Sequence, residues 1–141
     1  MVKALGLDLG VKTLGIAKSD FLGFVHGVET FRFKSLDFAS AANRVFELIN
    51  ELDIDVIVIG YPLTLRGNES EMSKNVLEFK KLLQNKDPLL KIELMDERLT
   101  SVSANKTLSL LNASHQKRKE NVDTLAAVEI LETYIRKENN K

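Results

Sequence analysis

The spacing of apolar residues changes once along the chain, and this change constrains the fold more than any other feature. Before position 34, short apolar runs separated by turns predict three strands, over Val2–Leu9, Leu14–Lys18 and Gly23–Phe33. The connections between these strands are too short for crossover helices. We therefore expect the first quarter of the chain to form an antiparallel meander.

The rest of the chain alternates between helical and strand-like patterns. Apolar residues from Phe38 to Leu52 recur at helical spacing, and Ser35 or Asp37 is available as the cap. Next we expect a strand, a helix, a strand and two helices, over Asp55–Gly60, Met72–Leu83, Lys91–Met95, Ser101–Leu111 and Asn121–Arg136. The first of these strands is a continuous apolar run, typical of a strand covered on both faces.

This order predicts an α/β fold in which one mixed five-stranded sheet carries helices on both faces. The later crossovers require parallel strands, whereas the meander is antiparallel. A length of 141 residues fits a single domain, over residues 1–141. In such sheets, sites lie beyond the carboxyl ends of the parallel strands. Residues at those ends are therefore the first candidates for function.

Composition excludes several kinds of site. The chain has no cysteine and only two histidines, so thiolate zinc sites, cysteine nucleophiles and histidine-rich metal sites are ruled out. Twenty basic residues balance twenty acidic residues, and this zero net charge does not by itself indicate a nucleic-acid binder. The N-terminus lacks the apolar region of a signal peptide, and no apolar run approaches the ~20 residues that span a membrane. We expect a cytoplasmic protein that does not enter a membrane.

Three carboxylates lie at the ends of predicted elements. Asp8 is near the end of the first strand, Glu97 follows the fifth strand, and Asp123 opens the last helix. Each has a structural alternative: a turn acceptor for Asp8, a surface pair with Arg98 for Glu97, and a helix-terminal acid for Asp123. Brought together, the three would repel one another unless a divalent cation neutralised them. Mg²⁺ suits such oxygen ligands, and paired ions can drive phosphodiester hydrolysis.

Basic residues near turns and loops are candidate contacts for a phosphate backbone. The densest run is Lys117 to Lys119, in the segment from His115 to Asn121 that we expect to be a loop before the last helix. A solvated loop is the alternative for this run, and a helix-entry loop is the alternative for the segment around Arg66. Asp96 and Asp20 stay open, the first as a further metal ligand and the second as a turn residue. The candidate nucleic-acid contacts are Lys12, Arg66, Arg98, Lys117, Arg118 and Lys119.

Four blocks of sequence carry a resemblance to a known family. They are LGLDLGVKTLGIAKSD, VIVIGYPLTLRGNESEMS, DERLTSVSA and KRKENVDTLAAVEILETY. In this order and spacing the chain resembles the YqgF family, also called RuvX, whose members have an RNase H-like fold. Family members have been described as Holliday junction resolvases and later as pre-16S rRNA nucleases. At Arg66 the chain departs from the family, which commonly has an acid in this loop.

The resemblance implies a function for the three carboxylates. Asp8, Glu97 and Asp123 would be the catalytic acids and metal ligands of a nuclease that depends on Mg²⁺ or Mn²⁺. The implied substrate is structured RNA, namely the 5′ end of the 16S rRNA precursor, and the implied state is a monomer or weak homodimer. Two alternatives stay open: resolution of Holliday junctions in branched DNA, and a non-catalytic nucleic-acid binding module.

Overall fold

The computed structural model describes the backbone of residues 2–100 and 116–140, and the side chains of residues 2–100 and 124–140. The expected helix over Ser101–Leu111 lies outside these ranges. The strands are β1 (Ala4–Leu9), β2 (Thr13–Ser19), β3 (Val25–Arg32), β4 (Val56–Tyr61) and β5 (Lys91–Asp96). The helices are α1 (Phe38–Leu52), α2 (Glu71–Lys86), the 3₁₀ turn η1 (Glu97–Leu99) and α4 (Gln116–Asn139).

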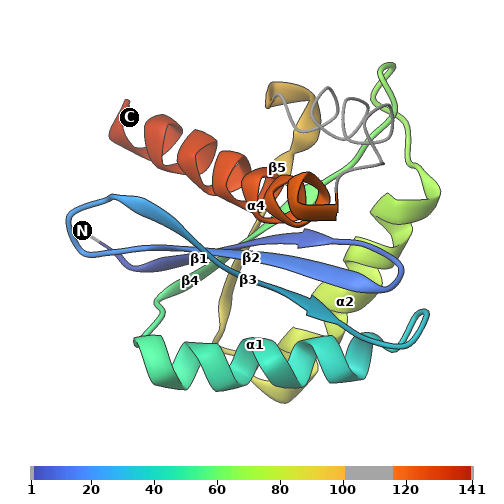
Figure 1. The fold of residues 1–141 in the computed structure, drawn as a ribbon, viewed down its shortest axis with the longest axis horizontal. Helices are drawn as coiled ribbons and strands as arrows, with labels where there is room; N and C mark the ends of the chain where they lie inside the picture. Colours follow the sequence, from blue (N-terminus) through green and yellow to red (C-terminus); the bar gives the residue numbers. More distant parts are fainter. Residues whose placement is uncertain (1, 101–115, 141) are drawn as a thin grey trace.

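The five strands form one mixed sheet in the order β3-β2-β1-β4-β5 (Figure 1). β1 pairs antiparallel with β2, and β2 pairs antiparallel with β3. β1 pairs parallel with β4, and β4 pairs parallel with β5. The predicted meander and mixed sheet are therefore confirmed, and the carboxyl ends of β1, β4 and β5 lie side by side at one end of the sheet.

Helices cover both faces of the sheet, as the sequence predicts. α1 and α2 pack on one face and α4 lies across the other (Figure 1). Side chains alternate between the faces because a strand has a period of two. In β1, Leu5 and Leu7 join the core under α1 and α2, whereas Ala4 joins the core under α4. Asp8 lies an even number of residues from Ala4 in β1, so its side chain points to the same face, the one covered by α4.

A glycine in β1 allows α4 to approach the sheet closely. A Cβ added at Gly6 would lie 2.8 Å from the Cβ of Leu131 and 2.9 Å from the carbonyl oxygen of Ala127. The second contact is to helix backbone, which cannot move without shifting the whole of α4. Gly6 therefore sets the distance between α4 and the strand that carries Asp8.

Polar side chains cap the two helices on the opposite face. Asp37, one of the two expected caps, accepts the backbone N–H of Ser40 at 3.3 Å and so begins α1. Ser70 caps α2 through a reciprocal capping box: Ser70 Oγ accepts the Ser73 N–H at 3.1 Å, and Ser73 Oγ accepts the Ser70 N–H at 2.8 Å.

In the described part of the chain, no helix has the length and apolarity needed to span a membrane.

The last helix begins earlier than the sequence pattern predicts. α4 starts at Gln116, not at Asn121, so the basic run lies at the beginning of the helix and not in a loop. Asp123 consequently lies within α4, and the interpretation of this residue as a helix-opening acid is wrong. The reason is that residues 116–123 contain no glycine or proline, and that polar Gln, Lys, Arg and Glu are good helix formers. A run of polar residues does not by itself indicate a loop.

Candidate active site at the strand ends

Two of the three predicted acids lie at the same end of the sheet, at strands separated by one strand. Asp8 lies at the end of β1 and is 9% exposed, and Glu97 follows β5 and is 4% exposed. The strand between them, β4, presents Gly60 at this level, because the parallel register pairs Leu7 with Ile59. A Cβ at Gly60 would lie 2.7 Å from Glu97 Oε1 and 2.6 Å from Ile130 of α4. The Glu97 carboxylate therefore lies over Gly60, on the face that also holds Asp8.

The backbone around Glu97 is held on both sides. Asp96 ends β5, and its carboxylate accepts the Arg98 N–H at 2.9 Å, which begins the 3₁₀ turn. Thr100 closes the turn, since its N–H and its hydroxyl both donate to the Glu97 carbonyl oxygen, at 3.1 Å and 2.8 Å. The 3₁₀ turn ends the extended backbone of β5 and directs the buried Glu97 carboxylate toward α4.

The expected alternative for Glu97, an exposed acid paired with Arg98, is wrong. The Arg98 guanidinium pairs with Asp96, with Nη2 at 2.7 Å and Nε at 3.0 Å from Oδ2. The hydrogen bonds from Arg98 hold the pKa of Asp96 below its usual value. Arg98 Nη1 also donates to the Leu65 carbonyl oxygen at 3.5 Å. Asp96 and Arg98 thus join β5 to the loop after β4, while contact between Arg98 and nucleic acid stays a prediction.

Asp123 is placed by its backbone alone. It lies four residues before Ala127 in α4, and Ala126, Ala127 and Ile130 are buried against the sheet. The structure describes the backbone at position 123 and not the side chain. The side chains described, those of residues 2–100 and 124–140, contain no group of three or more acids or histidines suited to a metal ion. The full triad stays a prediction.

Lys12 and Arg66, two further predicted basic contacts, lie with Arg98 at the same end of the sheet as the acids. Lys12 is exposed in the turn after β1, and its carbonyl oxygen accepts the Phe33 N–H at 2.9 Å. Arg66 is exposed in the loop after β4. The backbones of Lys117, Arg118 and Lys119 lie near the start of α4. Binding of nucleic acid by these residues stays a prediction.

Asp20, which the sequence leaves open, is a turn residue. It accepts the backbone N–H groups of Leu22 at 2.9 Å and Phe24 at 3.1 Å, and it lies 3.3 Å from Nε2 of His26. These contacts hold the β2–β3 hairpin. Since β2 runs antiparallel to β1, this hairpin is at the opposite end of the sheet from Asp8.

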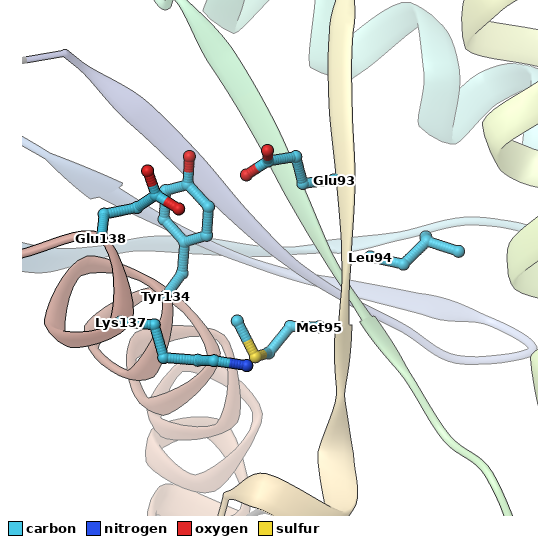
Figure 2. Close-up of a pocket in the computed structure, with 6 residues that line it drawn as sticks. All are labelled: Glu93, Leu94, Met95, Tyr134, Lys137 and Glu138. Atoms are coloured by element: carbon cyan, nitrogen blue, oxygen red, sulfur yellow. The ribbon is translucent and has the colours of Figure 1, made fainter. Parts of the chain in front are cut away.

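A separate pocket of about 360 Å³ lies between β5 and the C-terminal half of α4 (Figure 2). Burial, together with a hydrogen bond to Glu93, raises the pKa of the Tyr134 hydroxyl well above its usual value. The predicted acids do not line this pocket, and it runs along β5, not beyond the strand end. Its lining residues are Glu93, Leu94, Met95, Tyr134, Lys137 and Glu138.

Sequence reasoning missed the part played by Gly60. Its position could have been noted, because a glycine at the end of an apolar strand often marks a close approach of another group. What approaches it, the Glu97 side chain and Ile130 of α4, comes from other elements. Nothing in the local sequence indicates those contacts.

The sheet order, the helix layers and the acids at the ends of β1 and β5 define a protein of RNase H-like fold. The same fold is found in the structure titled "T. thermophilus RuvC in complex with Holliday junction substrate", at a TM-score of 0.61 and 14% identity over 98% of this chain and 97% of that one. A second Thermus thermophilus RuvC structure matches at a TM-score of 0.57 and 14% identity, covering 96% of each chain.

The chain belongs to the RuvX (YqgF) family. The model of this family, described as "RuvX: Holliday junction resolvase", matches residues 2–137. It is 38% identical to relatives from Geobacillus sp. (strain WCH70) and Bacillus subtilis (strain 168), over 95% of this chain and 97% of each relative. It is 41% identical to a relative from Sulfurihydrogenibium sp. (strain YO3AOP1), over 96% of this chain and 90% of the relative. All three carry the name "Putative pre-16S rRNA nuclease".

Proposed function

We propose that this chain is a metal-dependent nuclease that hydrolyses phosphodiester bonds in structured RNA, and that its substrate is the 5′ end of the 16S rRNA precursor. The observation that carries the proposal is the pair of buried carboxylates, Asp8 and Glu97, at the ends of β1 and β5, the strands on either side of β4 in an RNase H-like sheet. The names of the relatives support the choice of RNA substrate. Residues 1–141 act as one domain, and the protein works in the cytoplasm, where ribosomes are assembled.

The residues present fit a divalent cation. Two buried carboxylates held on one face repel each other unless a cation lies between them, and both offer only oxygen ligands. Gly60, between them, has no side chain to fill the space. Asp8, Glu97 and Asp123 would hold Mg²⁺ or Mn²⁺. When bound, such ions activate a water molecule and stabilise the leaving oxygen of a phosphodiester.

The other residues of the site position the RNA. Lys12 and Arg66 lie exposed at the same end of the sheet as the acids, where they would bind phosphates on either side of the scissile bond. The basic run Lys117–Lys119 would extend this contact along α4. Because the net charge of the chain is zero, binding depends on these local clusters and not on an overall positive field.

Holliday junction resolution is the second candidate, favoured by the description of the family. It would require two active sites, one for each strand cut, and hence a dimer on branched DNA. The proposed rRNA nuclease instead acts as a monomer or weak homodimer. A non-catalytic binding module is a third possibility, but a protein that only binds gains nothing from two buried acids beside phosphate.

The test is cleavage of a 16S precursor 5′ leader RNA and of a four-way DNA junction, in Mg²⁺, Mn²⁺ or EDTA. Wild type is compared with Asp8→Asn and with the control Asp20→Asn, whose amide oxygen can still accept the hairpin N–H groups. We expect metal-dependent cutting of the RNA that Asp8→Asn abolishes and Asp20→Asn retains. Cutting of the junction alone would identify a resolvase. Cutting of neither substrate would favour a binding module.

A further inference from the structure

The loop of residues 62–70, here called the wedge loop, exposes a large apolar side chain beside the candidate active site. Leu65 in this loop is 92% exposed to solvent. The loop follows the carboxyl end of β4 and projects beyond the sheet (Figure 1). Because β4 lies between β1 and β5, the loop begins between the strands that carry Asp8 and Glu97. Leu65 therefore stands in water at the end of the sheet where a substrate would bind.

Hydrogen bonds within the wedge loop constrain its backbone. The Thr64 N–H donates to the Asn68 carbonyl at 2.9 Å, and the Gly67 N–H donates back to the Thr64 carbonyl at 2.8 Å. The Asn68 N–H donates to Thr64 Oγ1 at 3.1 Å. Gly67 has a φ of +85°, a left-handed conformation that glycine adopts at no steric cost. These bonds hold the Leu65 backbone in one conformation without help from a partner.

The wedge loop is also tied to the segment that positions Glu97. Arg98 follows Glu97 in the 3₁₀ turn, pairs with Asp96, and donates to the Leu65 carbonyl oxygen at 3.5 Å. A Cβ at Gly67 would lie 3.0 Å from Arg98 Nη1, so the glycine allows the guanidinium to lie against the loop. The position of Leu65 is thereby set relative to the catalytic carboxylate.

We propose that Leu65 is a wedge that packs against a nucleobase next to the scissile phosphate, an inference that rests on the proposed nuclease function. The faces of the bases are the apolar surfaces that a nucleic acid offers, and apolar side chains inserted at a base step separate neighbouring bases. Arg66, exposed next in sequence, supplies a cation for the adjoining phosphate. The wedge separates one base from its neighbour, and so turns the phosphate between them toward Asp8 and Glu97.

The chain contains a matched control. Leu89 is 94% exposed, so it equals Leu65 in type and exposure, but it lies in the turn before β5, at the other end of that strand. Leu65→Ser and Leu89→Ser therefore remove the same apolar area from water. Their difference isolates the position of the side chain, because neither leucine contributes to the core.

The experiment places 2-aminopurine next to the cleaved bond of the precursor leader RNA and follows its fluorescence in EDTA, where no cleavage occurs. Binding is measured separately by anisotropy. We expect wild type and Leu89→Ser to raise the fluorescence as the base loses its stacked neighbour, and Leu65→Ser to bind within about threefold without that rise. In metal, Leu65→Ser should lose about tenfold in kcat/KM, and an abasic nucleotide at the flanking position should restore most of the loss.

Each other outcome overturns the inference in a distinguishable way. RNA binding without a fluorescence change in wild type would reject the wedge and leave the nuclease function standing. An equal rise with Leu65→Ser would also reject the wedge alone. Loss of cleavage in Leu65→Ser that the abasic substrate does not restore would assign the defect to structure. Failure of wild type to bind RNA would overturn both the proposed function and the wedge.

Discussion

Gly60→Ala tests whether the space over β4 belongs to the active site. The added methyl carbon would lie 2.6 Å from Cδ1 of Ile130, 2.7 Å from Oε1 of Glu97 and 3.3 Å from Glu97 Cγ. All three contacts are to side chains, and Gly60 is not among the glycines with positive φ, so the backbone itself accepts alanine. The substitution therefore acts by pushing the Glu97 carboxylate and Ile130 aside.

The two displacements have different consequences. Overpacking against Ile130 should lower the free energy of unfolding by about 1–3 kcal/mol. Displacement of Glu97 by about 1 Å should lower the cleavage rate by about 100-fold, because catalysis depends on the geometry of the reacting groups. Ile130→Val removes the Cδ1 atom and costs about 0.5–1.5 kcal/mol by itself. In the double variant the valine relieves the clash with Ile130 but not the clash with Glu97.

The assay is urea unfolding and RNA cleavage for wild type, both single variants and the double variant. We expect the two stability losses to be less than additive, because the residues are in contact. Cleavage should stay about 100-fold below wild type in the double variant. If Gly60→Ala folds and cleaves within about twofold of wild type, Glu97 does not act from the position over Gly60, and the site assignment is refuted.

Three further predictions concern the basic run Lys117–Lys119 and the two groups with a shifted pKa, Asp96 and Tyr134. Replacing Lys117, Arg118 and Lys119 with alanine should flatten the dependence of RNA affinity on salt, by about one counterion for each lost phosphate contact, and an unchanged slope would mean that the run is only solvated. Since Arg98 lowers the pKa of Asp96, the pair stabilises the fold above the ordinary carboxyl pKa of 3.8, and this stabilisation is lost as pH falls through the lowered value. The stability gap between wild type and Arg98→Met in urea should thus be full at pH 6 and narrow as the pH falls below 3.8, leaving the part that the hydrogen bond to the Leu65 carbonyl contributes; a gap that does not change with pH would contradict the pairing. In the Tyr61→Phe variant, Tyr134 is the remaining tyrosine, and burial and the hydrogen bond to Glu93 raise the pKa of its hydroxyl above the ordinary 10.0. Phenolate absorbance should therefore appear only when the protein unfolds in alkali. A reversible titration of Tyr134 near the ordinary value in the folded protein would contradict this prediction.

The strands, and the antiparallel pairing of the first three, could be predicted because their signals are local. Short turns force β1, β2 and β3 into a meander, and the apolar run of β4 indicates a strand covered on both faces. The start of α4 could not be predicted in the same way. Its first residues are polar and carry no cap or breaker signal, so periodicity does not distinguish them from a loop.

Site residues show the same division. The position of Asp8 at a strand end follows from the pattern of β1, and the order of elements predicts one mixed sheet whose parallel strands end on the same side. The burial of Glu97 does not follow, because the sequence Asp96-Glu97-Arg98 permits either acid to pair with the arginine. In the structure, the 3₁₀ turn pairs Asp96 with Arg98 and buries the Glu97 side chain beneath α4.

By itself, the sequence determines the class of this fold, the acids available to it and the absence of thiol chemistry, since these depend on local period and composition. The tertiary structure decides which acid is buried and which is paired, why position 60 must lack a side chain, and where Leu65 is held. Those features depend on contacts between elements far apart in the chain, such as Gly60 with Ile130 and Leu65 with Arg98. Spacing along one segment carries no information about such distances, because the packing of β1, β4, β5 and α4 sets them together.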